Sequence, residues 1–116
     1  MTIQYKNKGY KQADTNLNTV LTCPTDATVI VKSIYCANND ASSAILVNMS
    51  LVDSSDSSTE YEFFRDDVAA KTQVNASPQG INLEAGDSIK IQSATASNKI
   101  QGVISYAQID RSQENG

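Results

Sequence analysis

The sequence predicts an all-β protein folded as an antiparallel two-sheet sandwich of about eight strands, either jelly-roll-like or immunoglobulin-like. Short runs of residues alternate between apolar and polar side chains, which is the pattern of half-buried strands. Polar turn residues separate these runs at intervals of about ten residues. No amphipathic helix longer than one turn is visible. Together these observations favour two sheets packed face to face.

The expected strands follow one another with a turn signal at most of their ends. In chain order they are Thr19–Cys23, Thr28–Ala37, Ala44–Val52, Glu60–Arg65, Gln73–Ala76, Ile81–Leu83, Ser88–Ala94 and Lys99–Ile109. The first ends at Pro24, because proline lacks the N–H that a strand interior needs. The segment Asn38–Asp40 forms the turn after the second, since Asn and Asp tolerate left-handed backbone.

The later connections differ in how clearly they can be read. A polar loop over residues 53–59 connects the third strand to the fourth. The segment Val68–Lys71 suits a helical turn as well as a bend between strands. The run Ala85–Asp87 is a tight-turn signal, because the glycine at its centre adopts positive φ without steric cost.

The strand Thr28–Ala37 is apolar on both faces. Strict alternation puts Val29, Val31, Tyr35 and Ala37 on one face and Ile30, Ile34 and Cys36 on the other. This pattern is typical of a central strand covered on both sides, or of a strand whose outer face meets a partner.

The core is expected to hold the apolar side chains that recur with a period of two in the longer strands. These residues are Ile45, Val47, Met49, Leu51, Ile89, Ile91, Ile104 and Tyr106. Cys23 and Cys36 are expected as free, buried thiols, because a reducing compartment disfavours a disulfide and a free cysteine packs as a small apolar side chain.

Length and charge bound the class of protein. A chain of 116 residues suits one domain, and its net charge of −4 argues against a nucleic-acid binder, which needs clustered Lys and Arg. No run approaches the roughly 20 apolar residues of a membrane helix, and the N-terminus lacks the apolar core of a signal peptide. We therefore expect a soluble protein made in a cytoplasm, with no membrane partner.

The sequence offers few candidates for catalytic or metal-ligating residues. The chain contains no histidine, which removes the Ser-His-Asp triad, an imidazole base and most metal-ligand sets. Asp53, Asp56 and Glu60 offer oxygen ligands for calcium, but their segment lacks the glycine and spacing of an EF-hand loop, which favours a solvated hairpin tip. We therefore expect no enzyme, no catalytic residue, no metal and no cofactor.

The N-terminal segment differs from the rest of the chain in charge. We expect residues 1–18 to form an N-terminal arm or edge segment, residues 19–110 the sandwich domain and residues 111–116 a flexible tail. The first eleven residues carry three lysines and no acid, whereas the remainder carries six basic and thirteen acidic residues. The segment is either a basic, aromatic arm that docks on an acidic partner or an edge strand whose lysines discourage pairing. The candidate partner-binding residues are Ile3, Tyr5, Lys6, Lys8, Tyr10 and Lys11.

Four stretches carry a family resemblance: Thr22–Val31, Tyr35–Asp40, Leu83–Ile89 and Val103–Tyr106. In that order they resemble small virion structural proteins of tailed bacteriophages. The resemblance implies a non-enzymatic β-sandwich present in many copies, as a homo-oligomer, on a virion. It would act as a decoration or cement protein bound to the major capsid protein or to other virion proteins. A neck or tail component is the alternative within that class, and a carbohydrate-binding or host-adhesion module the alternative outside it. The scarcity of aromatic residues, 6% with no Trp, counts against a glycan binder.

Overall fold

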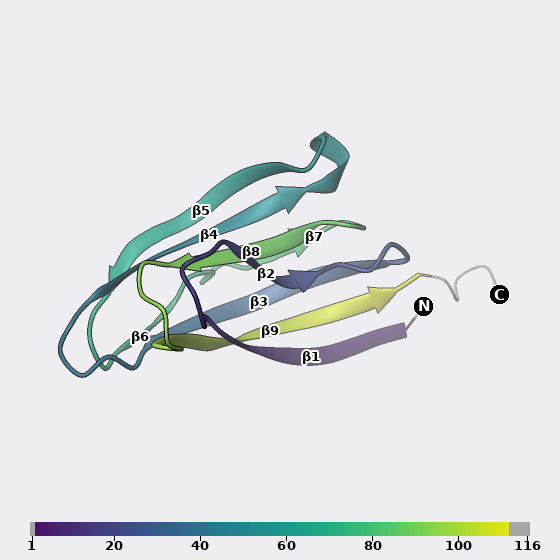
Figure 1. Cartoon of the computed structure of the whole chain (residues 1–116). Helices are drawn as coiled ribbons and strands as arrows, with labels where there is room; N and C mark the ends of the chain where they lie inside the picture. Colours follow the sequence, from purple (N-terminus) through teal and green to yellow (C-terminus); the bar gives the residue numbers. More distant parts are fainter. Residues whose placement is uncertain (1, 112–116) are drawn as a thin grey trace.

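The computed structural model, which describes residues 2–111, contains two antiparallel sheets packed face to face (Figure 1). One sheet has five strands in the order β1-β9-β3, and two short strands, β6 and β7, pair with the far side of β3. Its strands are β1 (Thr2–Lys11), β9 (Ile100–Asp110), β3 (Ala27–Asn38), β6 (Gln73–Asn75) and β7 (Ile81–Leu83). The other sheet has the order β2-β8-β4-β5. Its strands are β2 (Asn18–Thr22), β8 (Ser88–Ser93), β4 (Ile45–Asp53) and β5 (Thr59–Val68).

The predicted fold class is confirmed, and all eight expected strands are present with small shifts at their ends. The fourth extends to Val68, so Val68–Lys71 forms no helical turn and instead closes β5 and bends the chain. A 3-10 turn, η1 (Ser54–Asp56), lies in the polar loop after β4. No helix in residues 2–111 is long and apolar enough to cross a membrane.

The N-terminal segment forms the additional strand, β1. It pairs with β9 along its whole length, from Thr2 opposite Asp110 to Lys11 opposite Gln101, and so lies at the edge of the five-stranded sheet. The N-terminal segment is therefore an edge strand of the sheet, and its docking on an acidic partner stays a prediction. Most of the expected tail, residues 112–116, lies outside the described residues. Arg111 itself is held, because its backbone N–H donates to the Asp26 carbonyl and its guanidinium to the Thr28 hydroxyl.

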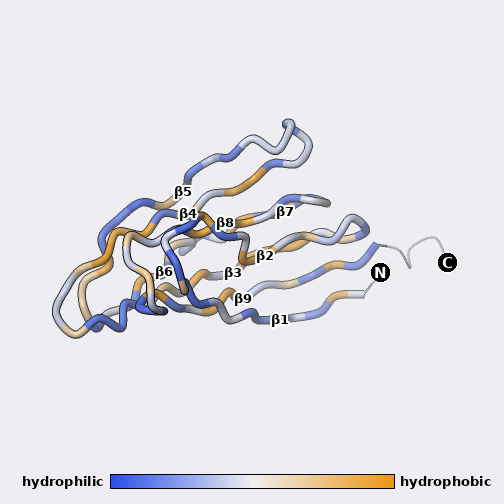
Figure 2. The backbone as a smooth tube through the Cα atoms, viewed as in Figure 1, coloured by the Kyte–Doolittle hydropathy of each residue, from blue (hydrophilic) through white to orange (hydrophobic). Residues whose placement is uncertain are grey.

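Apolar side chains from both sheets form the hydrophobic core. Hydrophobic residues occur along strands of both sheets (Figure 2). The residues expected in the core are buried, with one exception: Leu51 is only half-buried, although it packs against the core. Leu51 lies opposite the fully buried Ile89 and therefore on the inner face. Leu51 lies two residues before the end of β4, and the β4–β5 hairpin projects away from the five-stranded sheet at its tip (Figure 1).

A β-bulge in β3 corrects the expected assignment of its two faces. The pairing of β3 with β9 shifts between Val31 and Ser33, so Lys32 is an extra residue without a partner on β9. Alternation is broken at this point, and Val31 and Ile34 both face inward, with no exposed surface. Consequently Tyr35 points outward, on the same side of the sheet as Ile30.

Candidate partner-binding surface

The outward face of the five-stranded sheet carries most of the large apolar side chains that residues 2–111 expose. Cross-strand partners share a face, so the pairings Tyr5–Ala107–Ile30 and Gly9–Val103–Tyr35 each define a row on the outside. Five of the seven exposed large apolar residues belong to this face, which we call the outer surface. They are Ile3, Tyr5, Ile30, Tyr35 and Val103, with exposed fractions of 39 to 79%. Clustered apolar exposure of this kind typically marks a site of protein contact.

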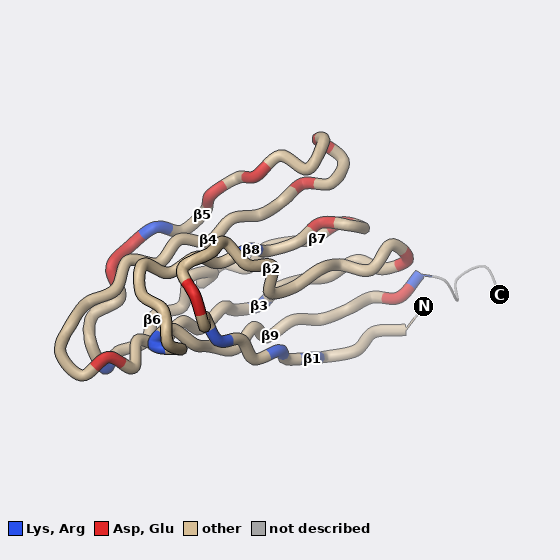
Figure 3. The backbone as a smooth tube through the Cα atoms, viewed as in Figure 1, with Lys and Arg blue, Asp and Glu red and all other residues tan. Residues whose placement is uncertain are grey.

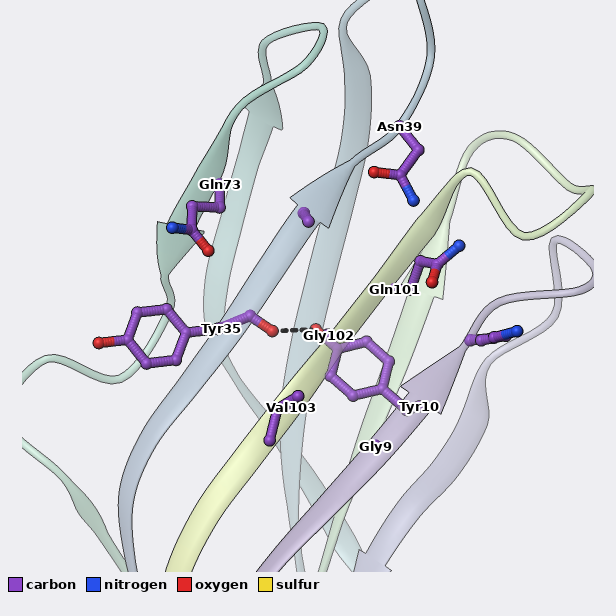
Figure 4. A pocket seen from close by; sticks show the side chains of 10 residues that line it. Gly9, Tyr10, Tyr35, Asn39, Gln73, Gln101, Gly102 and Val103 are labelled. Atoms are coloured by element: carbon purple, nitrogen blue, oxygen red, sulfur yellow. Dashed lines mark hydrogen bonds between the residues drawn. The ribbon is translucent and has the colours of Figure 1, made fainter.

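A hollow of about 670 Å³ lies on the outer surface near the ends of β1, β9 and β3 (Figure 4). Tyr35, Val103 and Gln101 line it, and Gln73 of β6 closes one side. Gly9 lies opposite Val103 and precedes Lys11 on the same face of β1. Because it has no side chain, it leaves room for the hollow. A Cβ built on Gly9 would meet only the Gly102 carbonyl oxygen, at 3.8 Å.

Behind this hollow, the side chain of Tyr10 clasps three strands together. The ring reaches from β1 across Gly102 of β9, and its hydroxyl donates a hydrogen bond of 2.8 Å to the Tyr35 carbonyl of β3 (Figure 4). A Cβ on Gly102 would lie 1.8 Å from the Tyr35 carbonyl oxygen and 2.6 Å from the Tyr10 hydroxyl, so the clasp requires glycine there. Burial of the phenol, with the Cys36 thiol beside it, raises the pKa of Tyr10 far above its ordinary value.

The six candidate residues on β1 do not lie together. Ile3 and Tyr5 belong to the outer surface, and Lys11 lines the hollow. Lys6 and Lys8 are exposed on the opposite face of β1, because they pair with the inward-facing Tyr106 and Ile104. Tyr10 is buried and belongs to the core, so its side chain is not available to a partner. These are the residues Ile3, Tyr5, Lys6, Lys8, Tyr10 and Lys11.

Sequence reasoning did not identify Ile30, Tyr35 and Val103 as part of such a surface. The signal was present in the two apolar faces of the strand Thr28–Ala37. Lys32, the bulged residue, also reaches this surface, with its ammonium 5.6 Å from the centroid of the Tyr5 ring. Most of the candidate surface therefore comes from the middle of the sheet, with the N-terminal strand at its margin.

The residues considered for calcium are engaged separately. Asp53 accepts hydrogen bonds from the backbone and hydroxyl of Ser55, Asp56 accepts from the Tyr61 hydroxyl, and Glu60 pairs with Lys90 at 3.6 Å. The structure instead brings Asp53 near Glu84 and Asp87, with one oxygen of each within 4.8 Å of the others.

In that group Asp87 is buried and already has hydrogen-bond donors. Its Oδ1 accepts from the backbone and hydroxyl of Ser54, and its Oδ2 accepts from the Glu84 backbone. These bonds fasten the turn before β8 to η1, so the carboxylate has a structural role without an ion.

Both cysteines are buried free thiols. Burial raises the pKa of both thiols, Cys23 and Cys36. A buried thiol that holds its proton is a poor nucleophile, so neither cysteine has the surroundings of a reactive site.

No protein-family model matches this chain, and no curated protein is similar to it. Its fold is shared by a chain in the acid-stable capsid of Helicobacter pylori bacteriophage KHP30, with 13% identity, a TM-score of 0.59, and 97% of this chain and 90% of that chain covered. It is also shared by a chain of the Bacillus endospore appendages, a family of disulfide-linked pili, with 11% identity, a TM-score of 0.52 and coverages of 96% and 90%. A chain of the infectious bursal disease virus Gx strain has 8% identity, a TM-score of 0.50 and coverages of 95% and 32%. At these identities the likeness establishes the fold alone.

Proposed function

We propose that this chain is a non-enzymatic structural protein of a bacteriophage virion, and that it decorates or cements the capsid by binding the major capsid protein. The observation that carries the proposal is the outer surface, a set of apolar side chains left uncovered on a sheet whose other face contributes to the core. A soluble monomer has no need of Tyr5 at 79% exposure beside Ile3 and Ile30. A protein held on a particle would bury these groups against its neighbour.

Two further points support a virion role. The capsid chain of phage KHP30 matches this chain over nearly the full length of both. Strands 1, 3 and 9 lie in one sheet and strands 2, 4, 5 and 8 in the other, so the chain crosses between sheets at most connections. We assign this order to the jelly-roll type, which is common in viral capsid proteins, because immunoglobulin domains pair their first two strands in one sheet.

Particle binding tests the proposal. We expect the triple variant Tyr5→Ser, Ile30→Ser and Val103→Ser to lose co-sedimentation with phage particles that lack this protein, because apolar contact supplies most of the energy of such interfaces. The matched control is Leu46→Ser with Tyr61→Ser, which removes the two exposed apolar side chains outside the outer surface.

The control should bind as the native chain does, and circular dichroism should show both variants folded. Normal binding by the triple variant would contradict the proposed surface. Imaging of labelled protein on the particle then distinguishes the head from the neck or tail, and label at the neck or tail would contradict capsid decoration.

A second candidate is a subunit of a cell-surface filament, favoured by the fold shared with the endospore pili. The protein would then form filaments without any capsid. Electron microscopy of labelled protein separates the two candidates, because label on filaments and not on phage particles would favour the filament subunit.

A further inference from the structure

The edge strand β1 is exposed to an unusual degree for a strand of a sandwich. Seven consecutive residues, 3–9, are exposed. On the side away from β9, no strand within residues 2–111 pairs with β1. Its charged residues are Lys6, Lys8 and Lys11, and none of them forms a salt bridge within residues 2–111. The strand therefore presents a free, positively charged edge.

The other sheet ends in a free edge of opposite charge, β5 (Figure 3). It has the same length as β1, ten residues, and carries four carboxylates and one arginine. Arg65 is occupied by a bidentate pair with Glu62, at 2.7 and 2.9 Å. Asp66 and Asp67 are exposed and have no cation partner among residues 2–111. The free charge on this edge is therefore negative.

We propose that copies of this chain associate edge to edge, with β1 of one copy beside β5 of the next, so that the five-stranded sheet of one continues into the four-stranded sheet of its neighbour. Unpaired backbone N–H and C=O groups on both edges supply the ladder, as when a strand is added to an open sheet. The occupant is a second copy because the complementary charge, at matching length, is carried by the same chain.

The charges also select this contact over the two symmetric ones. Two β1 strands side by side would bring six lysines together, and two β5 strands would bring their carboxylates together, so both pairings are repulsive. Only the β1–β5 contact is attractive. Such a head-to-tail contact leaves one free edge of each kind at the ends of any chain of copies, and it closes into a ring or extends as a filament.

Two charge-reversed variants test the contact. The β1 variant carries Lys6→Glu and Lys8→Glu, and the β5 variant carries Asp66→Lys and Asp67→Lys. The native chain should self-associate in sedimentation velocity at concentrations up to about 1 mM, and less so in about 0.5 M salt. Each variant alone has two edges of like charge and should associate about tenfold more weakly.

An equimolar mixture of the two variants should associate like the native chain, because the negative edges of the β1 variant then meet the positive edges of the β5 variant. The quadruple variant, which keeps the net charge of −4, should do the same. The matched control, Lys71→Glu with Lys99→Glu, changes net charge as the β1 variant does but lies off both edges, and it should still associate.

A native chain that stays monomeric at all these concentrations would overturn the proposal. So would a mixture that associates no better than its two components. The particle-binding assay tests the outer surface independently of the β1 and β5 edges. Either proposal can therefore fail without the other.

Discussion

Replacing Gly102 by alanine is expected to destabilise the sandwich by about 2 to 4 kcal/mol. The added Cβ would stand 1.8 Å from the Tyr35 carbonyl oxygen, a backbone atom that cannot rotate away, and 2.6 Å from the Tyr10 hydroxyl. Overpacking of this kind costs about 1 to 3 kcal/mol. The displaced Tyr10 also gives up its 2.8 Å hydrogen bond to Tyr35, which adds about 0.5 to 1.5 kcal/mol.

Urea unfolding measures this loss as a fall in the midpoint of about 1 to 2 M with an unchanged slope. The matched control is Gly9→Ala on the neighbouring strand, where the new methyl meets nothing closer than 3.8 Å. Alanine there should leave the stability unchanged or raise it by about 0.5 kcal/mol. Adding Tyr10→Phe to Gly102→Ala should not restore stability, because the overlap with the Tyr35 carbonyl persists. A midpoint for Gly102→Ala equal to that of the control would refute the reasoning.

Three other outcomes are expected. Ile89→Ala should lower the free energy of unfolding by about 2 to 5 kcal/mol and Leu51→Ala by roughly half as much, because Ile89 is fully buried and Leu51 is not; equal losses in urea would contradict this. Stability should fall as pH rises above about 10, since unfolded Tyr10 releases its proton near 10.0 while the folded state, whose pKa is raised, retains it; Tyr10→Phe should flatten that part of the pH profile, and an unaltered profile would count against it. Asp87→Ala should cost about 2 to 4 kcal/mol while a chelator leaves the melting temperature of the native chain unchanged, and a large drop with chelator would instead indicate a bound ion at this carboxylate.

Strand positions were predictable because period-2 alternation and turn residues are local signals. The bulge in β3 was not, because nothing in the order Val31, Lys32, Ser33, Ile34 marks where a pairing register will slip. That slip depends on the partner strand β9, which lies some seventy positions away in the sequence. One extra residue was enough to move Tyr35 off the face that it was expected to share with Val29 and Val31 and onto the outer surface.

The candidate surface shows the same division. Charge and apolar spacing in the N-terminal segment left open a docking arm or an edge strand, and two of its candidate residues, Ile3 and Tyr5, lie on the outer surface. They could not show that Tyr10 turns inward, because its burial depends on the absence of a side chain at Gly102 on another strand. A fit between two residues that are distant in the sequence, such as Tyr10 and Gly102, cannot be detected in either segment by itself.

The Tyr10 clasp has a consequence for how the edge of the sheet opens. Residues 3–9 of β1 are held mainly by their backbone hydrogen bonds to β9. The C-terminal end of the strand is also fixed by the buried Tyr10 phenol and by the hydrogen bond from the Gln12 backbone N–H to the Ile100 carbonyl. Local opening should therefore involve residues 3–9 and stop at Tyr10 unless the whole domain unfolds. The clasp thus divides the chain into a strand that can detach and return and a sandwich that remains intact while it does so.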